Sequence, residues 1–238
     1  MNLQKAPIQK YTIENIKYIE NYFNNPEIGS EISCYRLSYN QVLKIFDLNH
    51  IDFNSKLLIP DSIYGNNTYI FVDKIIEYHN KIYAYTMKYI EGPTLVKPEA
   101  MSLFYNLQYN ELLNYFKTII NDSKEIAKHG IEVYDCYKTN IILNDTGFKQ
   151  IDCIDFIQKD IDPTIIEQEN IKLMCQTIYD CLFAPFLTTF ITNNKLQVTD
   201  FLTTPYDFLK ELKNISQKYS DTEIITLNDT KKLSRKKI

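Results

Sequence analysis

Residues 134–156 read YDCYKTNIILNDTGFKQIDCIDF, and this stretch carries the strongest structural signal in the chain. Two short, largely apolar runs, residues 140–143 and 148–151, flank the tetrapeptide Asn144-Asp145-Thr146-Gly147. Asn, Asp and Gly tolerate the backbone conformations that tight turns need, so this tetrapeptide favours a turn between two paired strands. The sequence therefore predicts a β-hairpin here.

Polar side chains stand at both ends of the predicted hairpin. Asp135 and Asn140 precede it, and Asp152 directly follows its second strand. Mg²⁺ prefers oxygen ligands, so two carboxylates and an amide that flank one hairpin would suit this ion. Asp155 is a competing carboxylate, and Asp152 is favoured because it ends the apolar run directly.

The chain N-terminal to this hairpin is predicted to be mainly β. Apolar residues recur at three- and four-residue steps over residues 12–23, which predicts an amphipathic helix. After it, residues 32–46 suggest two strands with a turn near residues 38–40, and residues 70–78 and 81–90 suggest a second pair. Two hairpins are therefore expected before the chain turns helical.

The pattern becomes helical after residue 93. Residues 109–128, 165–183 and 206–219 carry apolar side chains at helical spacing. The basic segment 231–238 predicts a solvated, frayed terminus. The composition, 45% hydrophobic and 24% charged, is that of a globular protein with a core rather than of a disordered chain.

A β-rich lobe followed by a helical lobe that contains a polar hairpin is similar to the layout of protein kinases and their relatives. Over residues 28–183 the chain most resembles small, divergent bacterial kinase-like proteins. The resemblance implies an α+β, bilobal protein-kinase-like fold. Residues 1–91 would form an N-terminal helix and a small antiparallel β lobe, and residues 92–238 a helical lobe with the catalytic loop and a metal-binding hairpin.

Residues 134–140 resemble the kinase catalytic loop H-R-D-L-x-x-x-N, in which the Asp and the Asn are also five positions apart. By this resemblance Asp135 orients the acceptor hydroxyl, and Asn140 and Asp152 bind Mg²⁺. Lys138 stands one place later than the lysine that often follows the catalytic Asp, and it is a further candidate catalytic residue.

Two other segments imply nucleotide-binding residues. Residues 42–45 (Val-Leu-Lys-Ile) resemble the V-A-I-K strand, so Lys44 would bind the α- and β-phosphates of ATP, although a solvent-facing strand lysine would give the same pattern. Residues 85–95 resemble the last strand of the β lobe and the hinge, whose backbone pairs with adenine. The implied ATP contacts are Gly29, Ser30, Tyr35, Val42, Lys44, Met87, Lys88, Tyr89, Ile90 and Ile142.

The sequence departs from the kinase pattern in three places. The phosphate-covering loop keeps one glycine, Gly29. Residues 45–76 contain no Glu to pair with Lys44, which leaves Asp61 as an acidic stand-in, and no A-P-E follows Asp152. These departures keep two alternatives open. One is a pseudokinase that acts as a nucleotide-binding or protein-interaction module, and the other is an aminoglycoside- or choline-kinase-like small-molecule phosphotransferase.

Charge and composition narrow the expected partners and location. A net charge of −4 and a pI near 5.5 give no field that would attract nucleic acid or an anionic membrane. The five cysteines form no CxxC pair, and no run of about 20 apolar residues appears. The expectation is a cytoplasmic, ATP- and Mg²⁺-dependent kinase that phosphorylates a protein Ser or Thr in preference to a small molecule.

Overall fold

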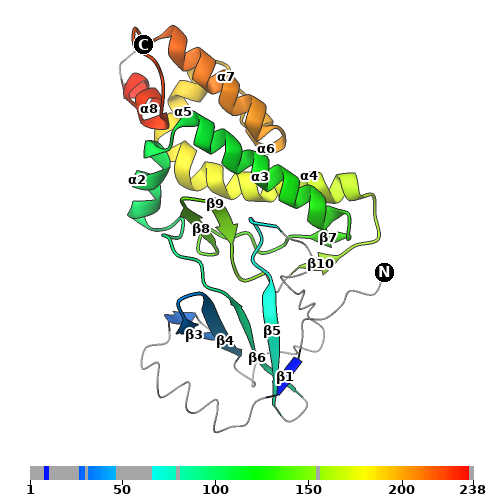
Figure 1. The fold of residues 1–238 in the computed structure, drawn as a ribbon. Helices are drawn as coiled ribbons and strands as arrows, with labels where there is room; N and C mark the ends of the chain where they lie inside the picture. Colours follow the sequence, from blue (N-terminus) through cyan, green and yellow to red (C-terminus); the bar gives the residue numbers. More distant parts are fainter. Residues whose placement is uncertain are drawn as a thin grey trace.

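The computed structural model describes residues 8–10, 27–29, 32–46, 66–78, 81–153 and 156–235 (Figure 1). Within these residues the strands of one sheet come first in the chain and most helices follow, so the fold is mixed α+β. Figure 1 shows the sheet below, the helices above, and a small hairpin between them. The predicted helix over residues 12–23 lies outside the described residues, as do Ser30, Asp61 and Asp155.

The sheet contains six described strands. They are β1 (Ile8–Lys10), β2 (Glu27–Gly29), β3 (Ile32–Ser38), β4 (Gln41–Phe46), β5 (Val72–Tyr78) and β6 (Lys81–Lys88). Their spatial order is β1-β5-β6-β4-β3-β2. Neighbours run antiparallel, except that β1 runs parallel to β5, a pairing that the sequence did not indicate. The β3–β4 and β5–β6 pairs confirm the two predicted hairpins.

One face of the sheet buries apolar side chains toward the helical part. Tyr85 and Met87 of β6 and Ile75 of β5 belong to one buried cluster, and Val42 of β4 packs against it. Side chains alternate between the two faces of a strand, so Lys44 points to the same face as Val42. The sheet thus presents a lysine next to a buried apolar cluster.

A small hairpin lies between the sheet and the helices. Its strands β8 (Ile141–Asn144) and β9 (Gly147–Gln150) pair antiparallel and confirm the hairpin predicted from residues 134–156. Gly147 has a φ of 115°, a conformation that residues with a Cβ rarely adopt, which explains the glycine in the turn. Strands β7 (Ile131–Glu132) and β10 (Ile157–Gln158) form a second antiparallel pair.

The helices form the upper part of the molecule in Figure 1. They are α2 (Pro98–Asn106), α3 (Tyr109–Ala127), α4 (Pro163–Ile178), the π-helical turn η3 (Tyr179–Phe183), α5 (Ala184–Asn193), α6 (Val198–Thr203), α7 (Pro205–Lys218) and α8 (Leu227–Arg235). The three predicted helices correspond to α3, to α4 with η3, and to α7, and are confirmed. Helices α2, α5, α6 and α8 were not expected.

The helices pack around aromatic side chains. Phe104, Phe116, Phe148, Phe183 and Phe201 are all nearly or fully buried. Their rings meet edge-on or tilted at centroid separations between 4.7 and 6.3 Å. Such arrangements suit the quadrupole of an aromatic ring and add to the hydrophobic contribution of burying it. This core contains Phe148 of β9 and therefore fixes the small hairpin against the helices.

The C-terminal basic segment corrects one expectation. Residues 231–235 belong to α8, in which Leu233 is buried. The Lys231 ammonium lies 3.6 Å from the centre of the Phe186 ring on α5, a cation–π contact. The prediction of a frayed terminus is therefore wrong for residues 231–235, because apolar residues at helical spacing and the cation–π contacts of Lys231 with Phe186 and Tyr105 dock this helix.

The helical run Pro163–Asn193 is long and apolar enough to cross a membrane by length and composition alone. Half of its most apolar window is buried inside this fold, as in the core helix of a globular protein. Pro185 lies just after η3, and a proline cannot donate the backbone hydrogen bond of a regular helix, which accounts for the wide turn before it. Length and composition alone are therefore weak evidence that this run crosses a membrane.

Residues 66–70 join the sheet to the helical part. The Asp122 carboxylate of α3 accepts hydrogen bonds from the backbone N–H groups of Asn67 (2.9 Å) and Thr68 (2.7 Å). The backbone N–H of Gln150 in β9 donates to the carbonyl of Thr68 at 2.7 Å. The segment that leads into β5 is therefore bonded to both a helix and the small hairpin, which fixes the sheet relative to them.

Candidate active site

The described structure brings Lys44 and Asp152 together. The Lys44 ammonium on β4 lies 2.7 Å from Oδ2 of Asp152, and the two side chains are 11% and 20% exposed. The Tyr85 hydroxyl on β6 donates a hydrogen bond of 2.6 Å to Oδ1 of the same carboxylate. Two residues to which the resemblance gives separate roles at the nucleotide thus lie in contact. Both oxygens of Asp152 are thus bonded to side chains that come from the sheet.

Tyr85 is a fixed hydrogen-bond donor at this position. Its side chain is fully buried, and burial raises the pKa of the phenol well above its usual value, with the negative charge of Asp152 adding to the effect. The phenol therefore stays protonated and keeps donating to the carboxylate at any physiological pH.

Asp152 has an unusual backbone. Its φ is 65°, in the left-handed region that non-glycine residues seldom enter. The neighbouring backbone is fixed by bonds on both sides, since Ile151 N–H donates to the Asn140 carbonyl at 2.8 Å and the Cys153 thiol donates to the Gln150 carbonyl at 3.3 Å. Residues held in such conformations cluster at functional sites.

The loop that carries Asp135 and Asn140 lies beside this turn. Asn140 Nδ2 donates to Oδ2 of Asp135 at 3.3 Å, and the Asn140 backbone is bonded to Ile151 as described. The Gln150 side-chain amide donates to the Asp135 carbonyl at 3.2 Å. Asp135 and Asn140 are thus tied to the strand that leads into Asp152, so the three predicted polar residues share one site.

Side chains of α4 hold the same loop from the helical side. Asn170 is fully buried, and its amide accepts from Val133 N–H at 2.8 Å and donates to the Ile131 carbonyl at 3.0 Å. Thr177 donates to the Cys136 carbonyl at 2.6 Å. The backbone is therefore fixed on both sides of Asp135, although the Asp135 side chain itself is only partly buried.

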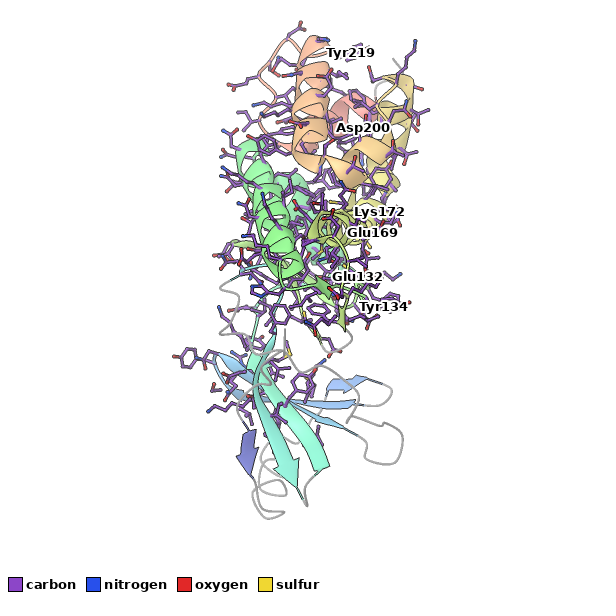
Figure 2. All side chains as sticks on the ribbon, turned by 90° about the vertical axis from the view of Figure 1, so that its right-hand side faces the viewer. Glu132, Tyr134, Glu169, Lys172, Asp200 and Tyr219 are labelled. Carbon is purple, nitrogen blue, oxygen red and sulfur yellow. The ribbon has the colours of Figure 1, made fainter. Side chains whose placement is uncertain are left out.

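Lys138 stands apart from this network. Its side chain is exposed, and its charge acts on the Cys181 thiol in η3. Figure 2 shows Tyr134 and Glu132 at the end of the helical part that faces the sheet, whereas Glu169, Lys172, Asp200 and Tyr219 lie farther from it. The loop thus presents Asp135 between exposed side chains, since Tyr134 and Tyr137 are also exposed.

A pocket of about 260 Å³ opens beside Lys44, a little smaller than typical ligand pockets of about 300–1,000 Å³. Its described walls contain three lysines, apolar side chains and no carboxylate, a lining that suits an anionic ligand with an apolar ring. The lining residues are Cys34, Val42, Lys44, Met87, Lys88, Tyr89, Ile90, Gly92, Pro93, Thr94, Lys97, Ile142 and Ile151. Seven of them are residues that the sequence implied for ATP.

The remaining implied ATP contacts are less informative. Gly29 pairs with Ile32 at the edge of the sheet, and Tyr35 pairs through its backbone with Leu43. The Tyr35 side chain and the whole of Ser30 lie outside the described residues. The implied contacts that line the pocket therefore come from β4, from β6 and the two residues after it, and from β8.

The hinge segment lies directly on the small hairpin. Leu143 N–H donates to the Pro93 carbonyl and Leu95 N–H to the Ile141 carbonyl, each at 3.0 Å. Gly92 has a φ of 138°, and a Cβ there would lie 2.6 Å from the Leu143 carbonyl oxygen. Only glycine allows this approach, which brings the Ile142 side chain into the pocket.

Sequence reasoning missed three residues that support the site. Tyr85 lies directly opposite Lys44 in the antiparallel register of β4 and β6, and this register becomes visible only in the fold. Gln150 and Asn170 carry no local signal, since an amide in a strand or a helix shows its function only through partners distant in sequence.

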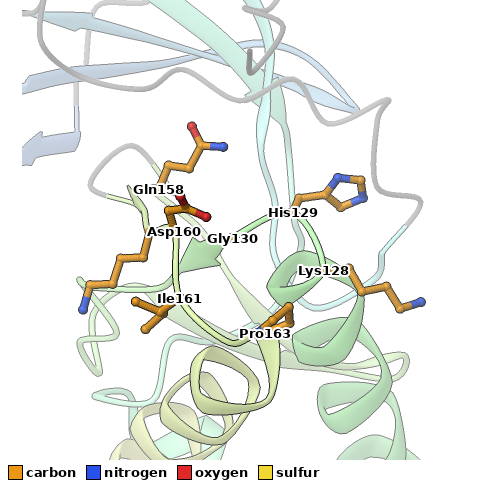
Figure 3. Close-up of a pocket in the computed structure, with 8 residues that line it drawn as sticks. Lys128, His129, Gly130, Gln158, Asp160, Ile161 and Pro163 are labelled. Carbon is orange, nitrogen blue, oxygen red and sulfur yellow. The ribbon is translucent and has the colours of Figure 1, made fainter. Parts of the chain in front are cut away.

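A second pocket of about 470 Å³ lies beside β7 and β10 (Figure 3). It is lined by Lys128, His129, Gly130, Gln158, Lys159, Asp160, Ile161 and Pro163. Both lysines are already paired, Lys128 with Glu125 at 2.6 Å and Lys159 with Glu132 at 2.7 Å. Figure 3 also shows Lys128 extending away from Asp160. The charged residues of this lining thus include side chains of both signs, the two lysines and Asp160.

Among the described residues, no three His, Cys, Asp or Glu side chains lie together as a metal site. Asp152 contacts the pocket residue Lys44, and the loop beside Asp152 carries the Asp135 carboxylate and the Asn140 amide, so these three side chains offer oxygen ligands next to the pocket lining. Comparison with known protein families gives no match for this chain, and comparison with curated protein sequences gives none either.

Proposed function

We propose that this chain is an ATP- and Mg²⁺-dependent phosphotransferase with a bilobal protein-kinase-like fold, which transfers the γ-phosphate of ATP to a hydroxyl group. The observation that carries the proposal is the Lys44–Asp152 contact of 2.7 Å, beside a pocket lined by lysines and apolar side chains. A cation from the sheet and a carboxylate from the hairpin then meet where a nucleotide phosphate chain would bind.

The nucleotide would bind with its base between the sheet and the small hairpin. Val42 and Ile142 line opposite walls of the pocket and would contact the adenine faces, and Met87 would limit its depth. The backbone of residues 88–90 would pair with the adenine edge. Lys44 would bind the α- and β-phosphates, exchanging the Asp152 carboxylate for phosphate oxygens.

The donor set fits Mg²⁺. This ion is commonly bound by one or two carboxylates together with substrate phosphates, so a cluster of three acidic side chains is not required. Asp152 and Asn140 supply one carboxylate and one amide oxygen, and their backbones are linked through Ile151. Bound there, Mg²⁺ would neutralise charge on the phosphates.

Asp135 would orient and deprotonate the acceptor. The acceptor oxygen attacks the γ-phosphorus, the bond from that phosphorus to the β–γ bridging oxygen breaks, and ADP leaves. The acceptor proton passes to Asp135. Most of the rate enhancement would come from positioning and charge neutralisation. Support comes from the Asn140–Asp135 hydrogen bond and from the buried amides that fix the loop.

We propose a protein Ser or Thr as the acceptor, in the cytoplasm, without nucleic-acid or membrane partners. A small-molecule acceptor is the second candidate, because α4 begins at Pro163 and residues 153–162 form the whole connection from Asp152. So short a segment leaves little backbone on which a peptide could dock.

The test is transfer of labelled γ-phosphate from Mg·ATP by the purified chain. It should be run on the chain itself, on generic protein substrates and on a panel of aminoglycosides and amino alcohols, with Asp135→Asn as the control. Transfer that Asp135→Asn abolishes supports the proposal, and the labelled product identifies the acceptor class. Nucleotide binding without transfer to any acceptor would favour a pseudokinase instead.

A further inference from the structure

We propose that Tyr85 positions Asp152 for the divalent cation, and that it keeps the carboxylate in place while Lys44 moves to the nucleotide. This inference rests on the proposed function and adds a residue to it. The two oxygens of the Asp152 carboxylate are bonded to two different groups, the Lys44 ammonium and the Tyr85 hydroxyl.

The geometry assigns each oxygen of Asp152 a separate partner. Tyr85 donates to Oδ1 at 2.6 Å, and Lys44 lies 2.7 Å from Oδ2. Lys44 and Tyr85 are directly opposite each other on β4 and β6, so both reach the same point from adjacent strands. A carboxylate fixed at both oxygens has a single orientation.

Only one of these partners can stay when a nucleotide binds. Lys44 carries the charge that the phosphates would require, so it must leave Asp152 at least in part. Tyr85 is neutral and fully buried in the sheet cluster, with no comparable reason to move. Its hydroxyl fixes one oxygen without neutralising the carboxylate, and this leaves the negative charge of Asp152 for a cation.

The surroundings supply no other described carboxylate for Lys44. Asp73, on β5 two strands away from β4, is exposed, and its Oδ2 accepts hydrogen bonds from Gln41 at 2.8 Å and from Thr86 at 3.4 Å. Among the described residues, Asp152 is therefore the carboxylate that forms an ion pair with Lys44. While Lys44 binds the nucleotide, another group must hold the Asp152 carboxylate in place, so that the ion pair can form again when the nucleotide leaves. The Tyr85 hydroxyl is that group.

Partners that hydrogen-bond a metal ligand typically change metal affinity by about 10–100-fold when they are removed. The test is therefore the Mg²⁺ dependence of nucleotide binding. The midpoint of thermal unfolding is measured at fixed ATP while Mg²⁺ is titrated, for the wild-type chain and for Tyr85→Phe, which removes only the hydroxyl. We expect Tyr85→Phe to need roughly 10–100 times more Mg²⁺ for half of the shift.

The matched control is Tyr109→Phe. Tyr109 is equally buried, and its hydroxyl is bonded to Thr230 at 2.7 Å in the helical part. The Tyr109→Phe variant should have a lower unfolding midpoint and the wild-type Mg²⁺ requirement, because it loses a hydroxyl with a purely structural role. Tyr85→His retains a ring N–H donor, so it should lie between wild type and Tyr85→Phe, and it serves if Tyr85→Phe does not fold.

The outcomes separate this inference from the proposed function. If wild type is stabilised by Mg·ATP and both Tyr85 variants show the wild-type Mg²⁺ requirement, the positioning role of Tyr85 is overturned and the proposed function stands. If wild type itself shows no stabilisation by Mg·ATP, the proposed function fails, and this inference fails with it.

Discussion

The two carboxylates of the candidate site are held in different ways. Asp152 is held through its side chain, by Lys44 and Tyr85 from the sheet. Asp135 is held largely through its loop backbone, by buried amides of Gln150 and Asn170 from the hairpin and α4. In the proposed function, nucleotide binding would therefore depend on the contact between sheet and hairpin, and the acceptor step would depend in addition on the loop that the hairpin and α4 hold. Changes at the two carboxylates and at the residues that hold them should therefore have different effects.

The largest effect is expected from Asp135→Asn. If Asp135 acts only on the acceptor, this change should lower turnover by roughly 10²–10⁴-fold, the usual contribution of a positioned general base. Stabilisation by Mg·ATP should stay close to wild type, because the interaction is used only in the transition state. Turnover and the nucleotide-induced rise in unfolding midpoint check this together.

Asp152→Asn is the counterpart at the other end of the site. It should remove turnover and also the Mg²⁺-dependent stabilisation by ATP, since an amide binds Mg²⁺ less well than a carboxylate. Wild-type binding in Asp152→Asn together with loss of binding in Asp155→Asn would move the metal site by three positions.

Full activity in Asp135→Asn would refute the assignment of Asp135 as the residue that deprotonates the acceptor hydroxyl.

Asn170→Leu should have the largest effect on stability. It leaves the Val133 N–H and the Ile131 carbonyl buried without their partner, and each unsatisfied group costs about 1–3 kcal/mol. We expect a loss of roughly 2–4 kcal/mol in the free energy of unfolding, measured by urea denaturation. Asn114→Ala, at an exposed position of α3, is the control and should change it by less than about 0.5 kcal/mol.

Gly92→Ala should have a smaller effect that falls on the nucleotide. A Cβ would lie 2.6 Å from the Leu143 carbonyl at a φ of 138°, so the hinge must shift away from β8. Such strain costs about 1–3 kcal/mol. Weaker Mg·ATP binding is expected, with hydrogen exchange at the Leu143 and Leu95 amides rising in the same variant. Unchanged exchange and binding would show that the hinge does not need this close contact.

The smallest effect concerns thiol reactivity. Burial raises the pKa of Cys136 to about 12, and raises the pKa of Cys153 and Cys175 as well, so these thiols should resist alkylation at neutral pH. Cys34 and Cys181 are partly exposed. Because Cys34 lines the pocket, Mg·ATP should slow its alkylation and leave that of Cys181 unchanged, as mass spectrometry of the labelled peptides would measure. Equal protection of both thiols would argue against ligand binding in this pocket.

The local signals in the sequence predicted the parts of the fold that rest on local chemistry. Turn residues and alternating patterns located the β3–β4, β5–β6 and β8–β9 hairpins, and helical spacing located α3, α4 and α7. The parallel strand β1 has no such signal, because its pairing is set by a partner more than 60 residues away. Helix α8 was missed because its basic surface hides the buried positions Leu227 and Leu233.

The candidate site divides in the same way. Asp135, Asn140 and Asp152 could be proposed because the stretch around one hairpin resembles the kinase catalytic loop and metal-binding hairpin, and Lys44 because its strand resembles V-A-I-K. Tyr85 and Asn170 support these residues through contacts that span 67 and 37 positions of the chain. Such contacts leave no trace in local pattern, because an isolated Tyr in a strand or Asn in a helix is ordinary.

The central claim is that Lys44 and Asp152 form a Mg·ATP site, and calorimetric titration of ATP into the chain at millimolar Mg²⁺ tests it most directly. We predict one site per chain, with binding lost in Lys44→Met and Asp152→Asn and retained in Asp135→Asn. A folded wild-type chain that takes up no nucleotide at millimolar Mg·ATP, or a Lys44→Met variant that binds as wild type does, would contradict the account.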